Sequence, residues 1–244
     1  MRHIKIFKIL SIALLTLCLS SSCKDYLNDQ SPSTFTESTI FTNIDFAQKA
    51  IFAGYAGINN TSAYAWHSML YYVGSDIEFC QFASSSSNWW DMMRYETTEN
   101  NTYVGSTWKA FYNAIEKVNI CIDNLPGSPI WENGETAGEA LRLYGEAVAI
   151  RALCYYTLMS VWGDVPFITH STRGDSDFFV PKTDRDEIYE YLIKELKEVE
   201  DYVPWMSETP ERISKGFIKG LRARMALSYA GYSLRNKTFE TRRG

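Results

Sequence analysis

The sequence predicts an all-α protein in which antiparallel helix pairs stack as a solenoid, on three observations. Four long stretches carry apolar residues at steps of three and four, the spacing of one helix face. Two of these stretches are apolar on two faces, so other helices must cover them from two sides. The 244 residues are 45% hydrophobic and 22% charged, which is the composition of a globular chain. The sequence shows no repeat with a period of about 34 residues, so the expected solenoid rests on the helix pattern alone.

Residues 1–22 have the layout of a secretory signal peptide. Residues 1–8 are basic, and Ile9–Leu19 is an apolar run of 11 residues, shorter than the roughly 20 that span a bilayer. Small residues then lead to Cys23 in a pattern that looks like a bacterial lipobox, although Ser20 stands where a leucine is usual. We expect Cys23 to be acylated and to anchor the chain to a membrane. The alternative is an ordinary secretory signal with an incidental cysteine.

Residues 23–44 are polar and are expected to form a lipid-anchored tether to a helical domain at residues 45–244. A first helix is expected over residues 45–58. The residues that it should turn to the interior are Phe46, Ala50, Phe52 or Ala53, and Gly57. Residues 60–106 show no sustained helical period, so we expect a long looped excursion with one short helix around residues 65–75.

Two longer helices are expected next, from Thr107 to a stop at residues 125–127 and over residues 136–162. The second has two apolar faces, and its Gly145 would let a neighbouring helix approach closely. Gly163-Asp164-Val165-Pro166 follows and is expected to be a turn, because glycine ends a helix and proline prevents its resumption.

Glu146 and Arg151 lie within this largely apolar helix. Charges in such a place are costly unless they are paired, so we expect buried pairs or cap contacts rather than ligand contacts. Cys121 and Cys154 also lie among apolar helical residues and are expected to be buried free thiols. A disulfide among these two and Cys80 is the alternative.

A further helix is expected from a cap at Thr183 or Asp184 to Pro204, with Glu187 completing a capping box with Asp184. The last helix should begin near Ser214 and is again apolar on two faces. Nothing after it would cover the second face, so we expect sequence to be missing beyond Gly244. The residues expected to lie uncovered are Phe217, Leu227, Tyr232 and Leu234.

Few residues suit catalysis, and the sequence favours a protein without enzymatic activity. His67 and His170 are the only histidines after the signal peptide, and the chain has no HExxH, GxSxG, phosphate loop or zinc pattern. Gly174–Asp177 is too short for a calcium loop. We therefore expect no catalytic residue, metal or cofactor. A carboxylate pair placed across a sugar stays open as the alternative. The net charge of −5 argues against nucleic-acid binding.

The loop at residues 76–103 mixes aromatic and polar residues in the way that sugar recognition requires. Flat rings stack on the C–H faces of sugars, while amides, carboxylates and guanidinium groups bind hydroxyls. No amphipathic helix is available to bury Trp89 or Trp90, although either ring could instead plug the underside of the loop. The candidate ligand-binding residues are Asp76, Asn88, Trp89, Trp90, Asp91, Arg94, Tyr95 and Asn101.

Four segments, taken in order and spacing, carry a resemblance to a known family. They are Cys23-Lys24-Asp25-Tyr26-Leu27; the helix with Trp108, Tyr112, Ile115 and Asn119; the stretch with Glu146-Ala147, Arg151-Ala152 and Tyr155 that runs to Gly163-Asp164-Val165-Pro166; and Arg185, Glu187-Ile188-Tyr189 with Ile213-Ser214-Lys215-Gly216. Together they resemble the SusD/RagB-like outer-membrane lipoproteins of Bacteroidota, with Ser214 replacing the usual threonine. The resemblance covers essentially the whole chain.

This resemblance implies TPR-like helix pairs with a looped ligand face. It also implies a surface-exposed lipoprotein of the outer membrane that covers a TonB-dependent, SusC-like transporter. Such a protein captures oligosaccharides, polysaccharides or other nutrients and is not an enzyme. Family members are roughly twice this long, so the chain would be an N-terminal portion. The alternatives are a secreted glycan-active hydrolase and a TPR-type protein-interaction scaffold.

Overall fold

The computed structural model describes residues 37–65, 77, 91–92, 94–172, 179–206, 209–235 and 238–240. The chain divides into two units, Met1–Thr36 and Glu37–Gly244, and the described residues all belong to the second. The expected signal peptide, Cys23 and most of the tether lie outside them. So do Cys80, Gly174–Asp177 and, apart from Ala65, the short helix expected around residues 65–75.

The described residues form helices and two small strand pairs. The helices are α2 (Glu37–Ile40), α3 (Ile44–Ile58), the π-helical turn η2 (Thr61–Ala65), α6 (Thr102–Asn124), α7 (Pro129–Glu132), α8 (Ala137–Trp162), α9 (Arg185–Val199) and α10 (Lys215–Ala230). Strand β1 (Val165–Pro166) pairs antiparallel with β2 (Lys182–Thr183), and β3 (Ser233–Arg235) pairs antiparallel with β4 (Thr238–Glu240).

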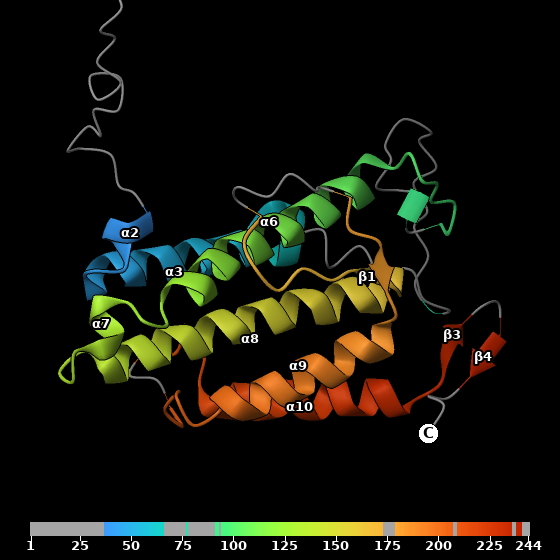
Figure 1. The fold of residues 1–244 in the computed structure, drawn as a ribbon. Helices are drawn as coiled ribbons and strands as arrows, with labels where there is room; N and C mark the ends of the chain where they lie inside the picture. The colour runs from blue at the N-terminus through green and yellow to red at the C-terminus, as the bar shows by residue number, and fades with distance from the viewer. Residues whose placement is uncertain are drawn as a thin grey trace, which may run out of the picture. The chain divides into compact units, whose positions relative to one another are not determined.

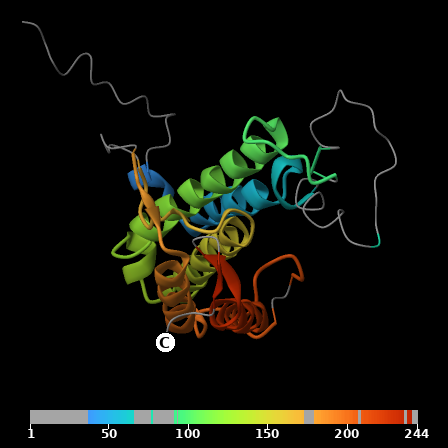
Figure 2. The ribbon, with the colours of Figure 1, turned by 90° about the vertical axis from the view of Figure 1, so that its right-hand side faces the viewer.

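Helix α8 lies in the middle of the bundle (Figure 1). Helices α3 and α6 run antiparallel and pack on one side of α8, while α9 and α10, again antiparallel, lie on its other side. Figure 2, turned by 90°, shows the same order from one end. The prediction of an all-α fold of antiparallel helix pairs is confirmed.

The two apolar faces predicted for α8 are both buried, which explains its central place. Its buried residues include Leu143, Ile150 and Leu158 on one face and Val148, Tyr155 and Met159 on the other. Gly145 faces the chain that follows α9, where an added Cβ would lie 2.7 Å from Cγ2 of Val203. The predicted close approach at this glycine is therefore confirmed.

The interior face of α3 was predicted only in part, since Ala50 packs against the core but most of the buried residues are others. Its buried residues are Ala47, Ile51, Gly54 and Gly57, whereas the side chain of Phe52 is 43% exposed. In a helix this rich in alanine and glycine, apolar residues occur all round, and their period leaves the buried face undetermined. Gly57 alone of the predicted interior residues is buried.

Helix α6 begins at Thr102, not at Thr107 as predicted. Asn101 starts it: the side-chain oxygen accepts hydrogen bonds from the backbone N–H groups of Tyr103 (3.0 Å) and Val104 (3.3 Å). The first turn also contains Gly105 and Ser106, so no apolar period extends through it. The helix start was missed because a cap, rather than periodicity, sets it.

The last two helices begin at the predicted caps. Asp184 accepts a hydrogen bond from the backbone N–H of Asp186 (2.8 Å), and Ser214 accepts one from Phe217 (3.2 Å). Their ends differ from the prediction. Helix α9 ends at Val199 rather than at Pro204, and α10 ends at Ala230, before Tyr232 and Leu234. Leu234 lies in β3 instead.

The second face of α10 is exposed, as predicted. Ile218, Leu221 and Met225 are buried against the bundle, while Phe217 and Leu227 lie exposed on the helix. Tyr232, just beyond the helix, is also exposed.

The turn after α8 has the predicted structural role. Gly163 has φ 76°, a left-handed conformation that favours glycine, and its N–H donates to the carbonyl of Met159 at 3.0 Å. Asp164 accepts a hydrogen bond from the backbone N–H of Arg185 at 3.3 Å and forms an ion pair with the side chain of Arg185. These contacts join the end of α8 to the start of α9.

Glu146 is fully buried in α8 and is paired, as predicted. It accepts hydrogen bonds from the hydroxyl of Tyr55 (2.9 Å), from Nε of Arg212 (3.0 Å) and from Nε of Arg142 (3.2 Å). Burial raises the pKa of Glu146, and the charge of Arg212 opposes that shift. The carboxylate thus joins α3, α8 and the segment before α10.

Arg151 is 1% exposed and is also paired, but not with Glu146. Its guanidinium donates to Oδ1 of Asn119 in α6 (2.8 Å), to the carbonyl of Thr169 (2.5 Å) and to Oε1 of Glu195 in α9 (2.5 Å). One side chain of α8 therefore joins the helices on both of its sides.

Replacing Arg151 with methionine should destabilise the protein by about 3–5 kcal/mol. The change removes one partner of a buried pair, so that Asn119 loses the guanidinium donor and Glu195 keeps only the hydroxyl of Tyr191 among the described residues. Urea unfolding followed by circular dichroism measures the loss.

The matched control for Arg151→Met is Lys194→Met, which also removes one positive charge. Lys194 and Glu198 form an exposed pair on α9 with a separation of 4.0 Å, so its loss should cost less than about 1 kcal/mol. Equal effects of the two changes would contradict a central role for Arg151.

Candidate functional site

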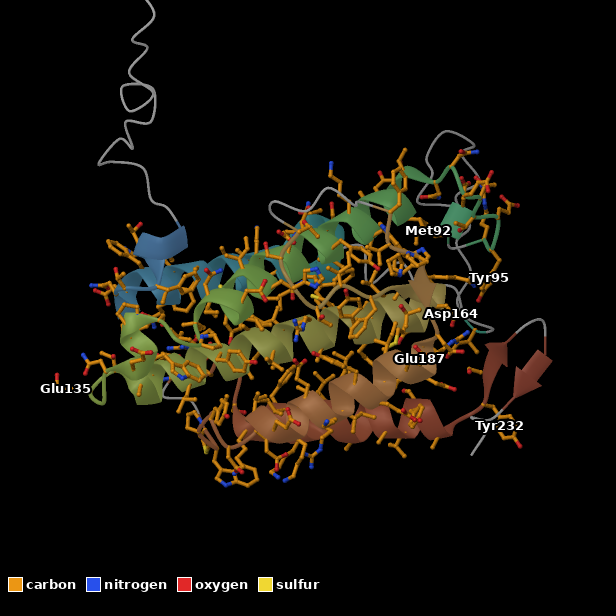
Figure 3. The ribbon with its side chains drawn as sticks, viewed as in Figure 1. Met92, Tyr95, Glu135, Asp164, Glu187 and Tyr232 are labelled. Carbon is orange, nitrogen blue, oxygen red and sulfur yellow. The ribbon has the colours of Figure 1, made fainter. Side chains whose placement is uncertain are left out.

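The candidate ligand-binding residues fall into two groups. Asp76, Asn88, Trp89 and Trp90 lie outside the described residues. Asp91, Arg94, Tyr95 and Asn101 lie within them. Figure 3 shows Met92 and Tyr95 at the same end of the bundle as Asp164 and Glu187, opposite to Glu135. The described part of the site is thus the short segment that leads into α6.

The structure brings Asp91 and Arg94 together, but their side chains contact each other. Nη2 of Arg94 lies 2.9 Å from Oδ1 of Asp91 and 3.0 Å from Oε2 of Glu96. The backbone N–H of Glu96 donates to the carbonyl of Asp91 at 2.9 Å, which closes the turn. Met92, inside the turn, is buried. We call Asp91, Arg94 and Glu96 the clasp.

Tyr95 lies at the tip of this turn. Its side chain is 75% exposed, and its backbone has φ 59°, in the left-handed region. Among the residues that the structure describes, every other one with positive φ is a glycine. A large ring held outward in this conformation is the clearest candidate for a ligand contact in the described segment.

Asn101 has a different place from the one that the sequence suggested. It is 4% exposed, and its side-chain oxygen is used by the first turn of α6. The side chain serves the start of the helix, which orients the loop before it.

Replacing Asn101 with alanine should cost about 0.5–2 kcal/mol of stability, because the first turn of α6 loses its cap. Any ligand affinity of the loop rings should change little. Thermal melting measures the loss of stability.

Asn101→Ser is the control for the cap, because serine also accepts hydrogen bonds at this position and should keep most of the stability. If both changes left the melting temperature intact but weakened ligand retention, Asn101 would be a ligand contact after all.

The described residues offer little for catalysis. They contain no group of three His, Cys, Asp or Glu side chains placed to hold a metal ion. His170 is exposed, and His67 lies outside the described residues. Cys121 and Cys154 are free and buried, as predicted, and burial raises the pKa of the Cys121 thiol to about 12.

No described helix has both the length and the apolar character needed to cross a membrane.

The structure also contains a hollow that the sequence analysis missed. It has a volume of about 630 Å³ and lies between α3 and the segment that precedes α10. Phe52 and Tyr64 line one side, and Thr209, Glu211 and Arg212 line the other. The guanidinium carbon of Arg212 lies 5.7 Å from the centre of the Phe52 ring. The hollow was missed because the sequence left open whether Phe52 or Ala53 faces the interior, and only the structure shows that the Phe52 ring is exposed.

Two polar groups of this hollow, those of Tyr55 and Arg212, are already engaged in the fold. Tyr55 and Arg212 both bind the buried Glu146, and the Tyr55 hydroxyl also accepts a hydrogen bond from the backbone N–H of Ile213 at 2.9 Å. The lining is mainly apolar as a result, which suits contact with another apolar surface better than contact with a sugar.

A family model described as SusD-like, "Starch-binding associating with outer membrane", matches residues 25–227. Among curated proteins, the chain is 24% identical over 184 residues to SusD-like protein P25 of Formosa agariphila, covering 72% of this chain and 34% of that protein. It is 21% identical over 228 residues to a SusD-like protein of Bacteroides ovatus, covering 93% and 40%. The chain thus spans little more than a third of the length of these relatives.

Solved structures show the same fold. A SusD homologue from Bacteroides thetaiotaomicron matches with a TM-score of 0.73 and 20% identity, covering 82% of this chain and 39% of that one. A laminarin-binding SusD-like protein matches with a TM-score of 0.67 and 24% identity, covering 77% and 40%. At such identities the likeness concerns the fold alone.

Proposed function

Because the chain belongs to the SusD-like family, whose model matches residues 25–227, we propose that it serves in glycan capture at the cell surface. In this proposal the protein is non-catalytic, binds an oligosaccharide or polysaccharide, and delivers it to a TonB-dependent, SusC-like transporter of the outer membrane. The family match is the observation that carries the proposal.

The exposed ring beside polar groups at one end of the bundle supports sugar binding. Tyr95 lies there in the described residues, and Trp89 and Trp90 precede it closely in the sequence. Rings of this kind stack on the C–H faces of sugars, and Asp76 and Asn88 would add hydrogen bonds to hydroxyls. Tyr95 and one of the two tryptophans, Trp89 or Trp90, are therefore the residues that we expect to touch the ligand first.

The contacts of the clasp carboxylates support binding rather than hydrolysis. Glycoside hydrolysis requires two carboxyl groups separated by a gap that accommodates the sugar and water. Asp91 and Glu96 instead share the guanidinium of Arg94, at 2.9 and 3.0 Å, which leaves no gap between them for a sugar.

The mainly apolar hollow beside Phe52 favours a second candidate function, a TPR-type scaffold that binds a protein partner. A chain of that kind would retain no glycan. Glycan retention therefore separates the two candidates.

Replacing Trp89 or Trp90 with alanine should weaken glycan retention by about 1–3 kcal/mol without a change in helical content, if the ring is a platform. We expect this of one ring and not of both, because adjacent side chains on an extended loop point to opposite sides. Affinity electrophoresis in gels that contain laminarin, starch or xylan measures retention, and thermal melting measures stability.

Trp205→Ala is the matched control, because Trp205 is an exposed tryptophan outside the candidate loop, and it should leave retention unchanged. A ring that plugs the loop would instead cost about 3–5 kcal/mol of stability when removed. Lower melting temperatures for both loop variants with unaltered retention would refute the platform role. Retention of no glycan by the unaltered protein would refute glycan capture.

For the anchor, we propose that acylated Cys23 holds the protein at the outer membrane. Cys23→Ala should yield an uncleaved or soluble periplasmic form, because the acceptor of the lipid is lost. Metabolic lipid labelling and membrane fractionation of cells measure this. A Cys23→Ala variant that still carries the lipid label in the membrane fraction would show that the anchor lies elsewhere.

A further inference from the structure

We propose that Asp91, Arg94 and Glu96 are positioning residues, which hold Tyr95 in a left-handed backbone so that its ring forms a preformed platform for a neutral sugar. This inference rests on the proposed function and deepens it. It assigns the contact to the ring and assigns Asp91 and Arg94, which the sequence suggested as ligand contacts, to the support of that ring.

The backbone of Tyr95 is the first step of the argument. With φ 59° it lies in the left-handed region, which bulky residues avoid because Cβ approaches the following carbonyl oxygen. Such a conformation persists only where its surroundings over-determine it, and such residues gather at ligand-binding sites.

The clasp supplies that support on both sides of Tyr95. Arg94 binds Asp91, which lies before the ring in the sequence, and Glu96, which follows it. The backbone hydrogen bond from Glu96 to Asp91 closes the same turn. The side chain of Arg94 is only 16% exposed, so the guanidinium is largely enclosed while the ring beyond it is open to solvent.

The contacts of Arg94 Nη2 and the burial of its Nε, which is shielded from solvent, indicate the class of ligand. A guanidinium that recognised a sugar carboxylate or sulfate would have to present its N–H fork to the ligand. Arg94 directs Nη2 at two protein carboxylates instead, and the three clasp side chains carry one positive and two negative charges. This excess of negative charge disfavours anionic glycans, so stacking of a neutral sugar on Tyr95 is the mode that remains.

The ring is tested by two substitutions at position 95 in the processed chain. Tyr95→Asn removes the ring, but asparagine tolerates the left-handed region. We therefore expect glycan retention to fall about tenfold while the melting temperature stays the same or rises. Tyr95→Phe keeps the ring and should retain glycan within about twofold of the unaltered protein. Laminarin is the neutral probe and polygalacturonate is the anionic one, which should not be retained.

The clasp is tested by Arg94→Met, alone and combined with Tyr95→Asn. Alone, it should weaken laminarin retention several-fold, because the ring loses its fixed position. In the Tyr95→Asn background it should cause no further loss, since a residue that acts through the ring has nothing left to position. A merely structural role would lower the melting temperature in both backgrounds without this coupling.

The outcomes separate this inference from the proposed function. Retention of laminarin by the unaltered protein and equally by Tyr95→Asn would overturn the platform and leave glycan capture intact. An equal further loss on Arg94→Met in both backgrounds would overturn the positioning role and make Arg94 a direct contact. If the unaltered protein retains polygalacturonate in preference to laminarin, the assignment to neutral sugars fails. If it retains no glycan, the proposed function itself fails.

Discussion

The buried guanidinium of Arg151 is the constraint on which the arrangement of the bundle depends. A charge inside a helix bundle is costly unless its donors find acceptors. Those acceptors come from α6, from α9 and from the chain after β1. Asn119 extends the network, because its amide nitrogen donates to the carbonyls of Ile168 (3.2 Å) and His170 (3.0 Å). One polar cluster therefore fixes three helices and the segment that leaves α8 relative to one another.

The central helix could be predicted from sequence because its signals are local. Two apolar faces require cover on two sides, and Glu146 and Arg151 among apolar neighbours require partners. Their partners could not be predicted, since Arg212 and Glu195 are remote in sequence and only the packing of the helices brings them close. The buried face of α3 was predicted only in part for a related reason, because apolar residues occur on several sides of that helix.

The sequence shows which chemical groups the candidate loop carries, but it does not show what each group does in the fold. An amide, a carboxylate or a guanidinium that could bind a sugar hydroxyl can equally cap a helix or close a turn. The contacts decide between these roles: Asn101 caps α6, and Asp91 binds Arg94. The left-handed backbone of Tyr95 had no sequence signal at all, because tyrosine is among the residues least expected there.

The left-handed turn at Tyr95 precedes a helix whose start is fixed. Met92 is buried inside the turn, and Asn101 fixes the first turn of the helix that follows. That helix is α6, which Asn119 joins to Arg151 and so to α8 and α9. A path of contacts therefore leads from the buried charge in α8 along α6 to Asn101, and the exposed residues 96–100 connect Asn101 to the turn at Tyr95. The left-handed backbone of Tyr95 is held by contacts within its own turn, those among Asp91, Arg94 and Glu96, and the bundle fixes the start of the helix that follows.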